Sequence, residues 1–231
     1  MKKIRRILSA ALAVLLSVCL SSYYPRNKDN VYVSGETDNK YIALTFDDGP
    51  HPEQTDRILD ILKKYNVKAT FFVIGENVNL YPEIVEREIE EGHEVGNHTF
   101  HHRRISKMTE CQLTNAILES ESAVYEICEY NTTAFRPPEG YCNDKVSKIA
   151  KKLGYNVILW KIDTYDWKGT AADIIADKVL KSIKNGDIVL MHDYISGRSN
   201  TAAALEILIP KLINEGYELV TVDELIEKSG C

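Results

Sequence analysis

The chain alternates short apolar runs of β-type residues with longer amphipathic segments, and this alternation constrains its fold more than any other feature. Apolar residues spaced three and four apart mark the amphipathic segments as helices. Three of these helices end in a Gly-x-x-apolar pattern, at Gly92, Gly154 and Gly216, where glycine can take the left-handed conformation that precedes a new strand. We therefore expect strands over residues 41–46, 69–74, 94–97, 133–135, 156–162, 187–191 and 217–221.

Alternating strands and helices form parallel sheets covered by helices, either as a closed barrel or as an open doubly wound sheet. Charged and histidine side chains follow most of the expected strands: Asp47, Asp48, His98, His102, Arg136, Asp163, Asp166 and His192. In a barrel the carboxyl ends of all strands share one rim, whereas an open sheet would scatter these residues. We therefore predict an α/β fold, a distorted (β/α) barrel of seven parallel strands with outer helices.

The composition fits one folded domain and excludes some partners. The 231 residues are 44% apolar, which is enough for a substantial core. The formal net charge is −6, and four of the 28 cations lie in the first six residues, so the remainder is more acidic still. Nucleic acids and anionic membranes are bound through clustered cations. We therefore expect no nucleic-acid partner, and membrane contact only through the N-terminus.

The N-terminal residues have the pattern of a targeting segment. Residues 1–22 start with cations and continue with an apolar run from Ile7 to Leu20, too short for a bilayer-spanning helix of about 20 residues. They predict a signal peptide or an uncleaved membrane anchor, and Cys19 leaves a lipoprotein signal open. The protein is then secreted or anchored at the cell surface. Residues 23–40 are polar and rich in turn formers, so they predict a linker, and 41–231 the folded domain.

Two motifs at the expected rim contain residues that bind metals. Asp47 and Asp48 lead into a Gly-Pro turn, and adjacent carboxylates can point apart, one to a metal and one to a proton. His98 and His102 are four apart, which on a helical turn puts both imidazoles on one face, while His101 should point elsewhere. A capped turn and a solvated loop are the ordinary alternatives. Together, one carboxylate and two imidazoles leave a fourth position open, the pattern of a catalytic zinc site.

Other motifs follow the later strands. Arg136 precedes two prolines that hold the backbone extended, so the N–H groups of this loop can point at a ligand; a rigid loop with a surface arginine is the alternative. Asp163 and Asp166 stand beside Trp167, and a tryptophan at a rim is often a platform for a sugar ring. His192 ends an apolar strand and is either a structural histidine or a general acid.

Taken in order, these motifs resemble the five motifs of the polysaccharide deacetylases, the NodB-like fourth family of carbohydrate esterases. The matching segments are Thr45-Phe46-Asp47-Asp48-Gly49-Pro50, His98-Thr99-x-x-His102, Arg136-x-Pro138, Asp163-x-x-Asp166-Trp167 and Leu190-x-His192. One such motif arises easily by chance, whereas five in the same order do not. The resemblance covers residues 41–229 and indicates that 41–231 is a polysaccharide deacetylase catalytic domain.

The resemblance implies a role for each matching residue. Asp48, His98 and His102 would hold a divalent metal ion, for which zinc is the first expectation, although other first-row metals suit the same ligands. Asp47 would act as the general base on the attacking water. His192 would protonate the leaving amine.

Further residues would support these groups and contact the substrate. Arg136 would orient the base, and either Asp166, which we favour, or Asp163 would tune the acid or the arginine. A backbone N–H after Arg136 would stabilise the oxyanion. The expected substrate contacts are Pro138, Glu139, Gly140, Trp167 and Leu190. Glu139 departs from the family pattern, in which many relatives carry an aromatic residue there, so the glycan bound by this groove is left open.

The leading hypothesis is a metal-dependent hydrolase that removes N-acetyl groups from an N-acetylglucosamine polysaccharide, with peptidoglycan first and chitin-type oligosaccharide next. An O-acetyl esterase acting on xylan would use the same residues. A non-catalytic glycan-binding protein on this scaffold usually lacks a metal ligand or the base, and all are present here. A metal phosphoesterase would need a second carboxylate cluster to bridge two ions.

Overall fold

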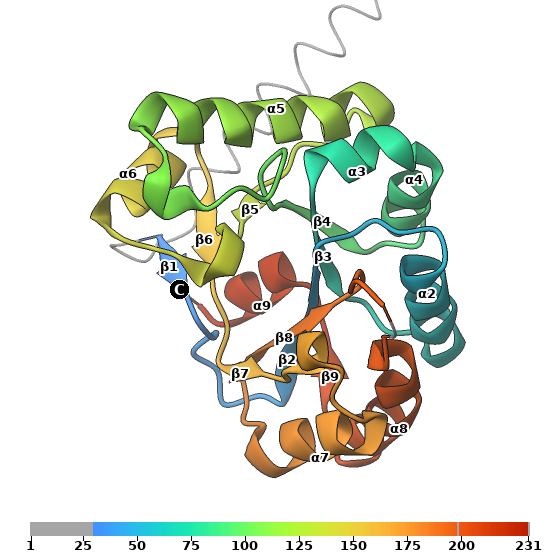
Figure 1. Cartoon of the computed structure of the whole chain (residues 1–231). Helices are drawn as coiled ribbons and strands as arrows, with labels where there is room; N and C mark the ends of the chain where they lie inside the picture. Colours follow the sequence, from blue (N-terminus) through green and yellow to red (C-terminus); the bar gives the residue numbers. More distant parts are fainter. Residues whose placement is uncertain (1–29, 198, 231) are drawn as a thin grey trace, which may run out of the picture.

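The computed structural model describes residues 30–197 and 199–230 and has the predicted α/β architecture, a distorted (β/α) barrel (Figure 1). Its strands are β1 (Val31–Tyr32), β2 (Tyr41–Asp47), β3 (Thr70–Val73), β4 (Glu94–Asn97), β5 (Ala134–Phe135), β6 (Asn156–Ile158), β7 (Ile162–Asp163), β8 (Ile188–His192) and β9 (Glu218–Leu219). Its helices are α2 (Gln54–Tyr65), α3 (Gly75–Leu80), α4 (Pro82–Glu90), α5 (Glu110–Cys128), α6 (Asp144–Lys152), α7 (Ala172–Ser182), α8 (Thr201–Asn214) and α9 (Val222–Lys228). The 3-10 turns are η1 (Ile105–Lys107), η2 (Pro138–Gly140) and η3 (Asp166–Lys168).

Local sequence signals account for where several helices begin and end. Thr109 and Thr221 each form a capping box, at the starts of α5 and α9, in which the threonine side chain accepts a hydrogen bond from the third helical N–H. Gly92, Gly154 and Gly216 all have positive φ, as the three predicted helix exits require. The strands that follow these glycines start two residues later, at Glu94, Asn156 and Glu218.

All paired strands run parallel, in the order β1-β6-β5-β4-β3-β2-β8-β7, with β9 also paired to β2. The strand expected over residues 156–162 is in fact two strands. The Leu159 N–H donates to the carbonyl of Tyr32 (2.7 Å), whereas the Lys161 N–H donates to the carbonyl of Ile188 (2.9 Å). The chain therefore crosses between the two ends of the sheet at residues 159–161, and this seam is where the barrel is distorted.

Side chains alternate across β2 between the helix layer and the barrel interior. Ile42, Leu44 and Phe46 belong to the outer hydrophobic cluster with the buried faces of α2 and α8. Ala43 belongs to the interior cluster, which α9 closes through Val222, Leu225 and Ile226. Thr45 and Asp47 continue the Ala43 face, so their polar side chains point into the barrel.

The domain begins earlier than the sequence predicted. Part of the expected linker, residues 23–40, forms β1, which pairs with β6, and Tyr32 is buried in the interior cluster. Ser34 bridges to Asp187, and the Gly35 N–H donates to the carbonyl of Gly186 at 2.8 Å. The residues around this short strand are polar and rich in turn formers, so no strand period was visible there in the sequence.

The expected signal or anchor segment, residues 1–22, lies outside the described residues. Within the part of the chain that the structure describes, none of the helices has both the length and the apolar character needed to cross a bilayer.

Candidate functional site

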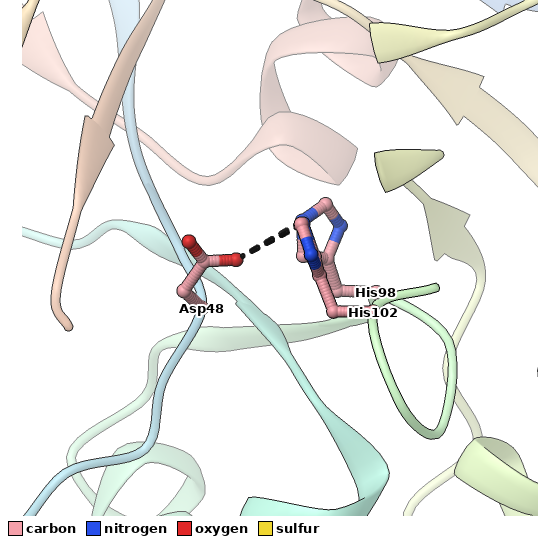
Figure 2. A group of neighbouring side chains, drawn as sticks. All are labelled: Asp48, His98 and His102. Atoms are coloured by element: carbon pink, nitrogen blue, oxygen red, sulfur yellow. Dashed lines mark ion pairs between the residues drawn. The ribbon is translucent and has the colours of Figure 1, made fainter. Parts of the chain in front are cut away.

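Three side chains converge at the carboxyl ends of β2 and β4 (Figure 2). Asp48 directly follows β2, and His98 and His102 lie in the loop after β4. The Oδ1 atom of Asp48 is 3.5 Å from Nε2 of His98 and 3.3 Å from Nε2 of His102. Ligands of a tetrahedral zinc ion, with bonds of about 2.0–2.2 Å, lie about 3.4 Å apart. The three side chains are therefore spaced as the ligands of one cation.

The hydrogen bonding of this cluster fits a metal ion. The Nδ1–H of His98 donates to the carbonyl of Arg136 at 2.7 Å, which leaves the lone pair of Nε2 facing Asp48. The Oδ1 atom of Asp48 is buried and has no hydrogen-bond partner among the described residues. Two lone-pair atoms at this separation repel each other unless a cation or a proton lies between them. His101, which we expected not to be a ligand, pairs instead with Glu76 at 2.9 Å.

The charges of the cluster favour an ionised carboxylate. Burial raises the pKa of Asp48, but His98, His102 and His192 outweigh this and lower it below its ordinary value. Burial lowers the pKa of His102, and the adjacent His98 lowers it further. Ligation needs an anionic carboxylate and neutral imidazoles, and the directions at Asp48 and His102 agree with it. Burial lowers the pKa of His98, but Asp47 and Asp48 outweigh this and raise it, so these carboxylates favour a positive charge beside them.

Arg136 is fully buried inside the barrel. The alternative interpretation, a rigid loop with a surface arginine, is therefore wrong. Its Nη1 donates to Oδ1 of Asp47 and to the hydroxyl of Thr45, each at 2.7 Å. The Nε and Nη2 atoms of Arg136 donate to the carbonyls of Ile158 and Leu159. The central carbon of the guanidinium lies 4.0 Å from the centre of the Phe72 ring. Burial lowers the pKa of Arg136, and Asp47 opposes this shift. The arginine therefore holds Asp47 through one oxygen and leaves Oδ2 facing His98, 3.7 Å from Nε2.

Asp166 contacts His192, and this contact settles which acid of the fourth motif lies against it. The Nδ1 atom of His192 is 2.8 Å from Oδ1 of Asp166, and the His192 backbone N–H donates to Oδ2 at 2.7 Å. The hydroxyl of Thr201 also donates to Asp166, at 2.9 Å. Burial lowers the pKa of His192, but Asp166 outweighs it and raises the pKa to about 9. Asp163 instead accepts a hydrogen bond from the N–H of Tyr165 at 2.8 Å.

One hollow of about 450 Å³, which we call the catalytic pocket, is lined by Asp47, Asp48, His98, His102, Asp163 and His192. Arg136 and Asp166 are fully buried and are not among its lining residues. Its walls include the expected substrate contacts Glu139, Gly140, Trp167 and Leu190. Pro138 is buried and is not among the residues that line this pocket. Trp160 packs on the interior cluster and also lines the pocket.

Asp193 is a supporting residue that sequence reasoning missed. It is buried, its carboxyl accepts a hydrogen bond from Thr55 at 2.7 Å, and its N–H donates to the carbonyl of Asp47 at 3.1 Å. A Cβ at Gly49 would overlap the Asp193 carboxyl, so the turn after Asp48 packs directly against it. The sequence shows only that an acidic residue directly follows His192, and it does not show what that acid contacts.

Comparison with known proteins agrees with this geometry. The family model of the polysaccharide deacetylases matches residues 34–158, which include the first three motifs. A peptidoglycan-N-acetylglucosamine deacetylase of Bacillus cereus is 44% identical over 199 residues, which cover 84% of this chain and 93% of that protein.

Two further similarities extend this result. The peptidoglycan-N-acetylglucosamine deacetylase PgdA of Listeria monocytogenes is 44% identical over 214 residues, 93% of this chain, and this chain spans 45% of that protein's length. The crystal structure of the Bc1960 peptidoglycan N-acetylglucosamine deacetylase superposes with a TM-score of 0.83 at 37% identity, covering 86% of this chain and 93% of that chain.

Proposed function

The chain belongs to the polysaccharide deacetylase family, and from that membership we propose that it hydrolyses N-acetyl groups of a polysaccharide and releases acetate. One observation carries the proposal. The Asp48, His98 and His102 cluster shares a single pocket with Asp47 and His192, a carboxylate and an imidazole that can move protons. In the register of β2 and β8, Asp47 lies beside His192.

We assign Asp48, His98 and His102 as the ligands of a divalent ion, with zinc as the expected metal because a carboxylate and two imidazoles suit it. When bound, the ion supplies Lewis acidity to the acetamide carbonyl and to the attacking water. The protein's contribution is to hold the ligands in position. The Arg136 carbonyl orients His98, and the turn at Gly49 packed against Asp193 orients Asp48.

Asp47 is assigned as the general base. Its Oδ1 accepts from Arg136, and its Oδ2 points toward the metal ligands, where an attacking water would lose its proton. The Nη1 of Arg136 donates to this carboxylate at 2.7 Å, and the rest of the guanidinium is fixed by the carbonyls of Ile158 and Leu159, so Asp47 keeps one orientation.

His192 is assigned as the general acid. Its Nδ1–H is held by Asp166, so the Nε2–H is left to be donated to the nitrogen of the leaving amine. A pKa of about 9 keeps the imidazole protonated at neutral pH, ready to donate. The Asp166 carboxylate is itself held by Thr201 and by the Trp167 N–H, so the imidazole keeps one orientation.

The loop after Arg136 is assigned to the developing oxyanion. Pro137 and Pro138 have no N–H, and the N–H groups of Gly140 and Tyr141 donate to the carbonyls of these prolines. The N–H of Glu139, a residue with φ of 58° in the wall of the pocket, is the donor we assign.

The proposed substrate is peptidoglycan, with the N-acetylglucosamine residue as the acetyl donor. The similar proteins of Bacillus cereus and Listeria monocytogenes carry that activity in their names. A chitin-type oligosaccharide contains the same acetamido sugar and is the second candidate. The basic and apolar residues 1–22 support a location outside the cytoplasm, secreted or surface-anchored, where such a substrate lies.

The test is acetate release by the metal-loaded protein from four substrates: peptidoglycan, chitooligosaccharide, acetylated xylan and a glycan without acetyl groups. Release from the N-acetylated glycans supports the proposal. Release from xylan alone would make the protein an O-acetyl esterase, and release from none would favour a glycan-binding protein on the same scaffold.

A further inference from the structure

A second hollow, of about 390 Å³, lies on the other side of the loop that holds the metal ligands. Within this loop, His98 and His102 line the catalytic pocket, whereas Thr99 and His101 line the second hollow. The opposite wall of the hollow is the first half of α5, including Gln112 and Asn115. We call it the basic hollow.

Three cations gather at the basic hollow: Arg103, Arg104 and Lys107 all line it, and all three are exposed. Arg103 and Lys107 form no ion pair with any residue that the structure describes. Glu119 is the acid among the lining residues. The cluster stands out because the chain as a whole has a formal net charge of −6.

Arg104 connects the basic hollow to the catalytic pocket. Its Nη2 is 3.2 Å from Oε1 of Glu139, and Glu139 lines the catalytic pocket. Both side chains are more than half exposed, so the pair is weak and can exchange partners. A ligand that occupies the catalytic pocket and carries an anionic group at its edge therefore meets Arg104 first.

We propose that the basic hollow binds the carboxylates of the short acidic peptide that is amide-linked to the lactyl group of the muramic acid next to the sugar that is deacetylated. The inference rests on the proposed function and names the substrate feature that the site distinguishes. Guanidinium groups bind carboxylates with two parallel hydrogen bonds, and Lys107 adds a point charge. Met108 and Ala116 give the hollow apolar surface for the small side chains of such a peptide.

The proposal makes the basic hollow a specificity site. Chitin-type oligosaccharides have no carboxylate, so they gain nothing from the three cations. A peptidoglycan strand places a carboxylate beside each N-acetylglucosamine. The net negative charge of the protein would repel that anionic strand. The cations of the basic hollow would offset this repulsion beside the catalytic pocket.

The test compares kcat/KM for acetate release from a peptide-bearing muropeptide and from a neutral chitooligosaccharide, using the full metal-loaded chain. In the variant Arg103→Glu/Lys107→Glu the ratio of the two kcat/KM values, muropeptide over chitooligosaccharide, should fall about tenfold through a higher KM for the muropeptide. Added salt should raise the wild-type KM for the muropeptide and have a much smaller effect in the variant. Lys107→Arg, which keeps the charge, should retain the wild-type ratio.

The matched control is Lys211→Glu, an exposed lysine on α8, on a different helix from the basic hollow. Combined with Lys184→Glu, at a second exposed lysine that lines neither hollow, it replaces two cations by two anions as the double variant does, and it should leave the ratio at the wild-type value. If the double variant keeps the wild-type ratio, with or without an equal loss of kcat/KM on both substrates, the inference is overturned. If the wild-type protein releases no acetate from either glycan, it is the proposed function that fails, so the two failures are distinguishable.

Discussion

At the scale of single residues, the chemistry of the site follows from which face of a strand each side chain occupies. Asp47 and Asp48 are adjacent, yet Asp47 faces the barrel interior and Arg136, while Asp48 has positive φ and turns toward the two histidines. The left-handed backbone at Asp48 is what separates the two carboxylates. Their chain positions predicted two roles, and the interior guanidinium distinguishes the two carboxylates by binding Asp47 alone.

Replacing Asp47 with asparagine tests the role of the base at this scale. Asp47→Asn keeps the size and a hydrogen bond to Arg136 but cannot accept the proton, so kcat should fall by about 100-fold or more. Because Asp47 is not one of the three assigned ligands, the variant should still bind one metal ion per chain. Acetate-release kinetics and metal content measured on the same preparation check this. Wild-type kcat in a metal-loaded Asp47→Asn protein would contradict the assignment.

The pH dependence of activity tests the pairing of His192 with Asp166. The pKa of His192 is raised to about 9, so the acid is protonated below that pH and activity should fall as pH rises through it. Asp166→Asn removes the anion that raises this pKa. The alkaline limb of the kcat/KM profile should therefore move to lower pH, toward the ordinary histidine value of about 6.5.

The corresponding change at the neighbouring acid is the control. Asp163→Asn should leave the alkaline limb where it is, because Asp163 contacts the N–H of Tyr165 and not His192. From the sequence alone the two acids could not be told apart, since both follow the same predicted strand within a few residues. If the alkaline limb of the kcat/KM profile moves in Asp163→Asn and stays in place in Asp166→Asn, then Asp163 and not Asp166 sets the pKa of His192.

At the scale of elements, the helices and most of the strands were predictable, including the two-residue strands β5 and β9, whereas β1 and the division of β6 from β7 were not. The capping box at Thr109 and the glycine exits specify helix ends through local hydrogen bonds, so α5 and its neighbours could be recognised. The β1 strand and the break between β6 and β7 depend on partners far along the chain. Residues 156–162 are uniformly strand-like, and only pairing to Tyr32 on one side and Ile188 on the other divides them.

The contribution of β1 is testable through Tyr32, which is 4% exposed in the interior cluster. Tyr32→Ala leaves a cavity there, and the free energy of unfolding should fall by about 3 kcal/mol, as for other buried aromatic residues. Chemical denaturation measures this change. Tyr125→Ala, at a tyrosine that is 49% exposed, should change it by less than about 0.5 kcal/mol. Equal effects would mean that residues 31–32 behave as the linker predicted from the sequence.

At the scale of the whole molecule, the barrel brings residues more than 140 positions apart in the chain to one rim. The strand ends after β2, β4, β5 and β8 supply Asp48, His98, Arg136 and His192, and parallel pairing puts all of them on the same side of the sheet. This convergence was predictable once the strands were taken as parallel. The depth of Arg136 inside the barrel could not be predicted, because the carbonyls that bind it belong to Ile158 and Leu159, where the chain leaves β6.

The most direct test of the account is a calorimetric titration of the metal-free protein with zinc. The structure predicts one ion per chain in the wild type, and at least a 100-fold loss of affinity in Asp48→Ala and in His102→Ala. Acetate release should return in proportion to the zinc bound by the wild type. Unchanged stoichiometry and affinity in these variants would contradict the claim that Asp48, His98 and His102 hold the catalytic ion.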